Sequence, residues 1–204
     1  MYNEDMMLQI FNHPEKVTEW ELEQDLVELP LWRRQKAMSF NFLIDRVLCA
    51  KAFLLLKRGV AKEYGITEQL NFDYINNGKP VLRNNPAINF NLSHCRRGVL
   101  CAISSKPVGC DIEEIETSLD LDLAHHCFNE QECRIITESE KPCVEFTKLW
   151  TVKEAVLKLT GDGINDDLPS LLTADLLDKL DIKTVVCENY GYVYSVCRYK
   201  ADLC

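Results

Sequence analysis

Two carboxylates stand at a spacing that could bind a metal ion. The stretch GCDIEEIE contains Asp111 and Glu113, and alternate residues of a β-strand point to the same face. On a strand their side chains would start about 7 Å apart. Paired oxygen ligands suit Mg²⁺, which usually takes one or two carboxylates together with phosphate and water. This stretch alone also allows the alternative of an acidic, solvated strand edge.

The stretch LWTVKEAVLKLTG is typical of a helix that mixes apolar and charged residues. Apolar residues at spacings of three and four predict a buried stripe, formed by Leu149, Val152, Val156 and Leu159. Glu154 and Lys158 are four residues apart and therefore share another face, which also carries Trp150. They could form a surface ion pair or a functional pair, and an aromatic side chain beside them is unusual for a solvated face.

Polar and basic groups in the first half are placed where ligand groups often lie. Lys79 follows a glycine turn, and Ser93 and His94 end an expected strand. His94 could serve as a general base, a phosphate ligand or a structural histidine. The sequence around Ser93 has no GxSxG pattern, and the chain has no P-loop or GxGxxG motif, so these residues do not indicate a hydrolase or a nucleotide-binding loop.

A basic segment, RRQKAMSFNFLIDR, precedes these strands. It offers Arg33, Arg34, Lys36 and Arg46 along an expected helix. Guanidinium groups bind phosphate in a bidentate manner, so a phosphate clamp is one interpretation. Solubility of an exposed helix is the other.

The elements that must position these groups follow from periodicity. Helical patterns are expected over 32–63, 119–139 and 143–160, and strands over 71–82, 88–94, 98–105, 106–115, 182–188 and 191–200. Strands and helices are mixed rather than strictly alternating. This order predicts an α+β chain of two lobes joined near residues 104–106, with one unit spanning 1–104 and the other 105–204.

Composition excludes several classes of protein. The 204 residues are 47% hydrophobic and carry a net charge of −9, which disfavours a nucleic-acid binder. No apolar run is long enough for a membrane span, and the N-terminal stretch is not expected to be a secretory signal. Ten scattered cysteines without a CxxC pair indicate reduced thiols in a cytoplasmic protein. The stretch HHCFNEQEC fits no standard zinc spacing.

Charge is distributed unevenly along the chain. The first 104 residues hold 13 Lys and Arg against 12 Asp and Glu, whereas the last 100 hold 10 against 20. Anion-binding groups are therefore expected in the first half and cation-binding groups in the second.

The order of these motifs resembles the Sfp-type 4′-phosphopantetheinyl transferases. That family has a G-x-D-x-E segment and, some 40 residues later, a W-x-x-K-E-[AS]-x-x-K segment. Both occur here, and the matching text is GKP at 78–80, NLSH at 91–94, VGCDIE at 108–113, FNEQE at 128–132 and LWTVKEAVLK at 149–158. The resemblance extends from about Arg33 to Gly163.

The resemblance implies a fold and an activity. The fold would be a pair of α/β lobes related by a pseudo-twofold axis, with the active site in the cleft between them. The activity would transfer the phosphopantetheine arm of coenzyme A to a serine of an apo acyl or peptidyl carrier protein and release 3′,5′-ADP. The chain is expected to act as a monomer, without nucleic acid or membrane.

The resemblance also implies roles for individual residues. Asp111, Glu113 and Glu154 would bind Mg²⁺, Lys158 would stabilise charge on the phosphate bridge, and Glu132 would be the base for the attacking serine. A water bound to Mg²⁺ could be the base instead. The contacts to coenzyme A would come from Arg34, Arg46, Lys79, Pro80, Ser93 and His94, with Lys153 nearby.

Two other functions stay open at this point. One is a different Mg²⁺-dependent phosphate enzyme, which the negative charge and the missing E-x-K motif disfavour as a nuclease. The other is an inactive module that binds carrier proteins, which the complete set of carboxylates with Lys158 disfavours.

Overall fold

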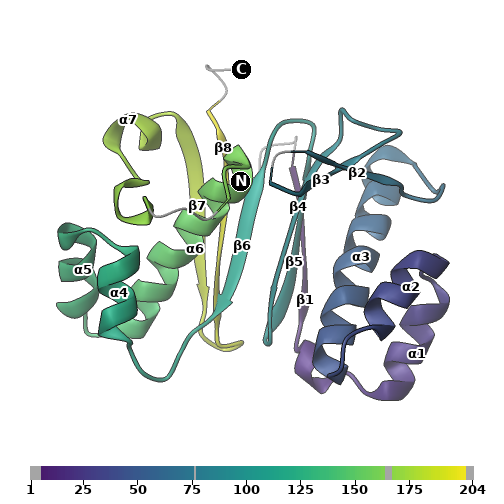
Figure 1. The fold of residues 1–204 in the computed structure, drawn as a ribbon, viewed down its shortest axis with the longest axis horizontal. Helices are drawn as coiled ribbons and strands as arrows, with labels where there is room; N and C mark the ends of the chain where they lie inside the picture. Colours follow the sequence, from purple (N-terminus) through teal and green to yellow (C-terminus); the bar gives the residue numbers. More distant parts are fainter. Residues whose placement is uncertain (1–5, 76, 164–166, 201–204) are drawn as a thin grey trace.

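The computed structural model describes residues 6–75, 77–163 and 167–200. Its helices and strands form a mixed α+β arrangement in which two three-stranded sheets lie between two groups of helices (Figure 1). The ends of the two expected units, residues 1–5 and 201–204, lie outside the described residues. The α+β class predicted from the sequence is confirmed.

The first half builds one antiparallel sheet in the order β1-β5-β4, with β1 at Met6–Asn12, β4 at Asn89–Cys95 and β5 at Gly98–Ser104. Helix α3 (Leu43–Tyr64) covers its outer face, and α1 (Glu19–Val27) and α2 (Leu31–Met38) pack outside α3 (Figure 1). The short helix η1 (Pro14–Lys16) follows β1, and the hairpin of β2 (Phe72–Ile75) and β3 (Lys79–Leu82) extends beside β4.

The second half contains a sheet with the same strand order as the first, in which the last strand lies between the other two. Its antiparallel sheet has the order β6-β8-β7, with β6 at Gly109–Glu114, β7 at Leu180–Cys187 and β8 at Tyr192–Tyr199. Helix α6 (Pro142–Thr160) lies across this sheet, and α4 (Leu121–Cys127) and α5 (Glu130–Thr137) pack on α6 (Figure 1). The short elements η2 (Leu168–Ser170) and α7 (Ala174–Leu177) connect α6 to β7.

Helix α6 approaches β6 closely because Gly109 has no side chain. A Cβ at Gly109 would collide with the carbonyl oxygen of Ala155 and with Leu159. The residues on β6 that share this face, Asp111 and Glu113, are consequently held directly under the helix. The glycine of the G-x-D-x-E segment thus serves to bring the carboxylates of the strand to those of the helix.

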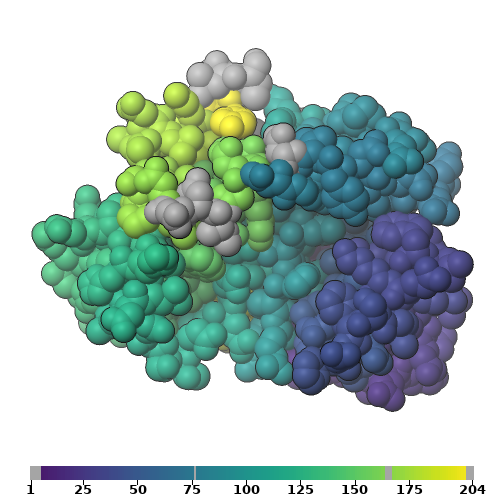
Figure 2. All heavy atoms as spheres, viewed as in Figure 1, coloured from purple at the N-terminus to yellow at the C-terminus, as the bar shows by residue number. Residues whose placement is uncertain are grey.

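Apolar side chains from both sheets fill the space between them. The first sheet contributes Leu100, Ala102 and Cys95, and the second contributes Cys110, Ile112, Tyr192, Tyr194 and Val196. Separate cores lie between α3 and the first sheet and between α6 and the second. The two halves therefore share one layer of core. In the space-filling view they lie side by side in close contact (Figure 2).

The helix expected over 32–63 is two helices, α2 and α3, with a break at 39–42. Ser39 hydrogen-bonds the carbonyl of Lys36, and Arg46 donates to the carbonyl of Phe40, which stabilises the turn between them. The pattern over 119–139 is also two helices, α4 and α5. Apolar periodicity continued through both breaks, so the apolar pattern did not reveal them.

Two elements near the N-terminus were missed from the sequence, β1 and α1. Helix α1 begins with a capping box, in which the Thr18 side chain accepts from the backbone of Glu21 and the Glu21 carboxylate accepts from Thr18. That T-x-x-E pattern was visible in the sequence and predicts a helix start.

None of the helices in the described part of the chain is both long and apolar enough to cross a membrane. The nine cysteines within the described residues have free thiols, and seven of them are buried. Cys204 lies outside the described residues.

Candidate active site

The ammonium group of Lys158 joins the two halves of the molecule. It lies 2.5 Å from Oδ1 of Asp111 on β6 and donates to Oγ of Ser93 on β4 at 3.1 Å. The Ser93 hydroxyl in turn donates to the same Asp111 oxygen at 2.7 Å. Asp111 is only 1% exposed, so this is a charged network at the edge of the shared core.

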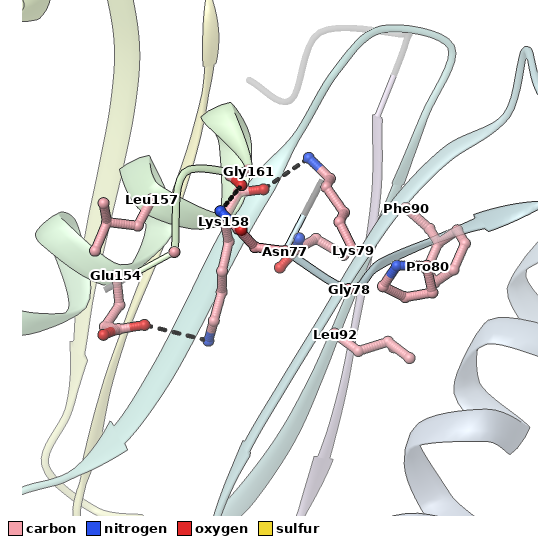
Figure 3. A pocket seen from close by; sticks show the side chains of 12 residues that line it. Asn77, Gly78, Lys79, Pro80, Phe90, Leu92, Glu154, Leu157, Lys158 and Gly161 are labelled. Atoms are coloured by element: carbon pink, nitrogen blue, oxygen red, sulfur yellow. Dashed lines mark hydrogen bonds and ion pairs between the residues drawn. The ribbon is translucent and has the colours of Figure 1, made fainter. Parts of the chain in front are cut away.

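Two further carboxylates surround this network. Glu154, one turn before Lys158 on α6, places its Oε2 4.0 Å from the ammonium (Figure 3). Glu113 lies two residues after Asp111 on β6 and accepts a hydrogen bond from the indole of Trp150. The aromatic residue on the charged face of α6 therefore has a polar partner, and Glu154 and Lys158 do not form a plain surface pair.

The arrangement has unused capacity to bind a cation. Oδ2 of Asp111 and Oε1 of Glu154 are buried and accept no hydrogen bond within the described residues. Buried carboxylate oxygens without partners are costly, and a hard cation would satisfy them. Among the described residues no three His, Cys, Asp or Glu side chains converge into a metal site as they stand, and the Lys158 ammonium lies among these carboxylates. The predicted Mg²⁺ ligation stays a prediction.

Crowding of negative charge shifts the pKa values of these groups. Burial, with the neighbouring charges of Asp111 and Glu154, raises the pKa of Glu113 to about 7. Burial and Asp111 also raise the pKa of Glu154, against the opposing effect of Lys158. Burial alone would lower the pKa of Lys158, but its contacts with Asp111 outweigh this and raise it. Lys158 thus stays charged, while the carboxylates have more negative charge than one lysine neutralises.

A cavity of about 320 Å³ opens beside this network (Figure 3). Glu154 and Lys158 lie at its polar end, and its walls are apolar, formed by Pro80, Phe90, Leu92 and Leu157. Across the cavity the β2–β3 turn, residues 77–79, faces the end of α6. The cavity is therefore walled by both halves, with its charge concentrated on the α6 side.

Lys79 lies on this cavity, but its ammonium already has partners. It donates to the carbonyl oxygens of Lys158 at 2.7 Å and of Leu159 at 2.9 Å, in the last turn of α6. Pro80 forms part of the cavity wall beside it. The structure brings both residues to the cleft as expected, although Lys79 would have to leave α6 to contact a phosphate.

Ser93 and His94 point to opposite faces of β4, as neighbours on a strand must. Ser93 faces β6 and the Lys158 network, whereas His94 is exposed and lies on the side covered by α3. Loss of hydration, followed by the nearby positive charges of Lys158 and Arg33, lowers the pKa of His94. His94 is therefore neutral at pH 7 without a ligand, and its phosphate contact stays a prediction.

Arg34 and Arg46 are occupied by backbone carbonyls near the helix ends. Arg34 donates to Leu26 at 2.9 Å and Val27 at 3.4 Å, at the end of α1, and Arg46 donates to Phe40 at 2.8 Å. The structure does not bring either guanidinium to the Lys158 network, and their roles as phosphate contacts stay predictions.

Lys153 requires a correction. It was expected near coenzyme A phosphates, but it is fully buried and its ammonium donates to Oε2 of Glu132 at 2.8 Å and to the carbonyls of Cys127 and Leu168. These three acceptors come from α4, α5 and η2, so Lys153 ties α6 to the neighbouring elements of its own half. A side chain with no exposed surface and three acceptors does not contact a substrate.

Glu132 shares this structural environment. It is 8% exposed, and its Oε2 accepts from the backbone N–H of Asn129 as well as from Lys153. With the Asn129 side chain it forms a capping box at the start of α5, a pattern that N-x-x-E in FNEQE already indicated. The structure brings Glu132 to Lys153 and not to the Lys158 network, so its role as a base stays a prediction.

The coenzyme A contacts implied by the resemblance did not include Arg33 and Lys36, which the basic segment had offered only as part of a possible phosphate clamp. Both line a second cavity of about 240 Å³ together with five aromatic side chains, Trp32, Phe53, Phe72, Tyr74 and Phe90. Arg33 lies over the Phe53 ring, and its Nε is buried without a hydrogen-bond partner in the described residues. Nη2 of Arg33 donates to the carbonyl of Cys49 at 2.9 Å. Aromatic rings beside cationic groups suit a base and its phosphate. Aromatic residues next to RRQK in the sequence were the available signal.

Comparison with known proteins agrees with the motifs. Residues 107–196 match the family model described as the 4′-phosphopantetheinyl transferase superfamily. The 4′-phosphopantetheinyl transferase psf-1 of Bacillus pumilus is 38% identical over 141 residues, which cover 68% of this chain and 60% of that protein. Over the matched residues the chain is similar to the 4′-phosphopantetheinyl transferase superfamily.

Two other similar proteins point to the same superfamily. The 4′-phosphopantetheinyl transferase Sfp of Bacillus subtilis (strain 168) is 28% identical over 141 residues, covering 68% of this chain and 62% of Sfp. The 4′-phosphopantetheinyl transferase HetI of Nostoc sp. (strain PCC 7120 / SAG 25.82 / UTEX 2576) is 39% identical over 104 residues, covering 47% of this chain and 44% of HetI. The chain thus spans about three fifths of the length of psf-1 and of Sfp. The recognition of the Sfp-type family from the motifs is confirmed.

The raised pKa of Glu113 predicts that the stability of the protein depends on pH. The folded state holds the Glu113 proton up to about pH 7, whereas an unfolded glutamate releases it near 4.5, so the free energy of unfolding falls as pH rises between these values. We compare the free energy of unfolding of Glu113→Gln with that of the parent. This difference should favour the variant by on the order of 2 kcal/mol more at pH 8 than at pH 4.

Urea denaturation at both pH values, without divalent cations, measures this difference. Glu130→Gln, which changes an almost fully exposed carboxylate on α5, is the matched control. Parallel pH dependences for the parent and Glu113→Gln would refute the expected burial cost.

Proposed function

We propose that the chain transfers the 4′-phosphopantetheine group of coenzyme A to a serine of an apo acyl or peptidyl carrier protein. The observation that carries this proposal is the Lys158 ammonium held between Ser93 and the buried Asp111, with Glu154 and Glu113 beside it. The segment that matches the superfamily model, residues 107–196, contains the members of this network other than Ser93. Relatives named 4′-phosphopantetheinyl transferases support the same reaction.

Coenzyme A would bind across the two cavities. Its adenine and 3′-phosphate suit the aromatic cavity with Arg33 and Lys36, and its pyrophosphate suits the polar end of the larger cavity at Lys158. Gly78 and Pro80 line both cavities, so one elongated ligand could pass along this turn. The contacts expected from Arg46, Lys79, Ser93 and His94 belong to this proposal, whereas Arg34, bound at the end of α1, is tested separately below.

Mg²⁺ would be held by Asp111, Glu113 and Glu154. The unpartnered oxygens of Asp111 and Glu154 and the raised pKa of Glu113 support this choice, since each reports negative charge without compensation. When bound, the ion would neutralise charge on the pyrophosphate and act as a Lewis acid.

The residues of the chain would guide one phosphoryl transfer. The serine oxygen of the carrier, losing its proton to Glu132 or to a water, forms a bond to the phosphorus next to pantetheine, and the bond from that phosphorus to the bridging oxygen breaks, releasing 3′,5′-ADP. Lys158, kept charged by Asp111, would stabilise the negative charge that develops on the leaving phosphate. Glu132 could accept the serine proton only by giving up Lys153, so its contacts favour a positioning role.

The arrangement of the halves would follow the family. We assign residues 1–104 to a lobe that binds coenzyme A and residues 105–204 to a lobe that carries the metal site and α6, related by a pseudo-twofold axis. Two three-stranded antiparallel sheets, each covered by one long helix, support this assignment. A monomer in a reducing compartment such as the cytoplasm fits the free thiols, and light scattering would test the oligomeric state.

One incubation tests the activity. The protein is mixed with coenzyme A, Mg²⁺ and apo acyl or peptidyl carrier proteins, and the mass of each carrier is followed. A mass increase by one phosphopantetheine group supports the transfer. Release of phosphate products without carrier modification would indicate another Mg²⁺-dependent phosphate enzyme, and carrier binding without any reaction would indicate an inactive module.

Separate variants test where the nucleotide binds. Lys36→Ala is expected to raise the KM for coenzyme A roughly tenfold with an unchanged melting temperature, because it removes one charge-assisted phosphate contact. Arg34→Ala should lower the melting temperature, because its side chain bonds the end of α1. Steady-state kinetics and thermal unfolding measure both, and a reversed pattern would return Arg34 to the phosphate site and remove Lys36 from it.

A further inference from the structure

The end of α6 is held by side chains from the other half of the molecule. Asn77, in the β2–β3 turn, donates from Nδ2 to the carbonyl oxygens of Gly161 at 3.1 Å and Asp162 at 2.7 Å. Lys79, two residues later, donates to the carbonyls of Lys158 and Leu159. The turn therefore serves as a C-terminal cap for a helix about 80 residues away in sequence (Figure 3).

These contacts fall where the helix needs them. The last carbonyl groups of an α-helix have no partner within the helix, and they carry partial negative charge that a cation stabilises. In α6 the chain reverses at Gly161, which has a φ of 81°, so the carbonyls of the final turn point out toward the β2–β3 turn. The Lys79 ammonium satisfies two of them, those of Lys158 and Leu159, and the Asn77 amide binds the carbonyls of Gly161 and Asp162, which directly follow α6.

The contacts of Asn77 and Lys79 with the end of α6, together called the clamp, act on the residue at the centre of the candidate site. The backbone carbonyl of Lys158 is bound by Lys79, while its side-chain ammonium reaches Asp111 and Ser93. Lys158 is therefore fixed at both ends, and Glu154 one turn earlier moves with it. Ala155, Val156 and Leu159 pack α6 against the second sheet independently of the turn, so the fold does not depend on the clamp.

We infer that Asn77 is a positioning residue, which holds the end of α6 across the cleft and thereby sets the placement of Lys158 for transfer. This inference rests on the proposed function for its effect on turnover. Asn77 lies outside the motifs that carry the resemblance. It directly precedes the GKP segment at 78–80, whose residues the resemblance does include. Asn77 would not touch the reacting atoms, and it would act through the backbone of α6.

The test uses changes that separate the side chain from the turn. Asn77 has a φ of 32°, so alanine would strain the turn as well as remove the amide. Asn77→Asp keeps the shape and tolerates this backbone but has no donor for the two carbonyls. Asn77→Gly relieves the backbone and removes the side chain. Asn71→Asp is the matched control, because that amide donates only locally, to the carbonyl of Gln69.

We expect Asn77→Asp and Asn77→Gly to lower kcat roughly tenfold, because small displacements of a catalytic group cost about this much or more. The KM for coenzyme A should change by less than about twofold, as expected for a loss confined to the transition state. In a Lys158→Ala background, Asn77→Asp should lower turnover no further, because its effect passes through Lys158. A merely destabilising change would still lower turnover there.

Hydrogen exchange tests the clamp without any reaction. The amides of residues 157–162 should exchange roughly threefold faster in Asn77→Asp, with β8 and the Asn71→Asp protein unchanged. Unchanged exchange would overturn the clamp, and faster exchange with unchanged kcat would overturn the positioning role. If the parent protein transfers nothing to any carrier, the proposed function fails, and the exchange result alone then decides the clamp.

Discussion

Lys153→Ala is expected to destabilise the folded protein by about 3–5 kcal/mol. The substitution removes a fully buried ammonium and leaves the Glu132 carboxylate and the carbonyls of Cys127 and Leu168 without their donor. An uncompensated buried charge costs far more than the lost contact itself. Chemical denaturation followed by circular dichroism measures the change.

Two comparisons sharpen this prediction. Lys153→Met should also destabilise the protein, because it leaves the Glu132 carboxylate unpaired. Adding Glu132→Gln to Lys153→Met should recover part of this loss, because it removes the unpaired charge. Lys148→Ala, which breaks a more exposed pair with Glu145, is the control and should cost less than about 1 kcal/mol. Equal effects of Lys153→Ala and Lys148→Ala would contradict the role assigned to Lys153. Near-normal transfer by a folded Glu132→Gln protein would remove Glu132 as the base.

Asp111→Asn is expected to lower carrier modification roughly 10³-fold while the fold survives. Asparagine has nearly the same shape but no charge, so it would neither hold the Lys158 ammonium nor bind a cation through a charged oxygen. The effect should appear in kcat, measured as the rate of phosphopantetheine attachment to the carrier by mass spectrometry.

Glu114→Gln provides the control for this change. Glu114 lies on the same strand, but its carboxylate pairs with Arg97 away from the Lys158 network. Its transfer rate should stay within about threefold of the parent. Full activity of Asp111→Asn would remove Asp111 from the metal site, and an unfolded Asp111→Asn protein would shift the test to Glu154→Gln, which lies on α6 near the surface of the cavity.

The sequence predicted those features that repeat along an element. The strand GCDIEEIE and the helix LWTVKEAVLK were placed correctly because period-two and period-3.6 patterns are local, and their carboxylates fall on the faces expected. The break between α2 and α3 was not predictable in this way, since apolar residues continue on both sides of it.

Contacts between distant segments were beyond local patterns. Lys153 and Glu154 are neighbours in one motif, but neighbouring positions on a helix point about 100° apart. Only packing showed that Lys153 faces α4 and α5. Arg33 and Arg34 are equally basic and adjacent, and the structure alone separates the one over an aromatic ring from the one at the end of α1. Lys79 on the end of α6 likewise needed the tertiary structure.

The apolar layer shared by the two sheets has a consequence for synthesis of the chain. All three strands of the first sheet are complete by Ser104, so this half can form its own hydrogen bonds before the rest leaves the ribosome. Its inner face, with Leu100 and Ala102, is covered by apolar residues of strands β6, β7 and β8, and β8 ends at Tyr199. During translation of the next nearly one hundred residues, the nascent chain would therefore carry a complete sheet with one apolar face exposed to solvent. That interval is when chaperones would matter most to this protein.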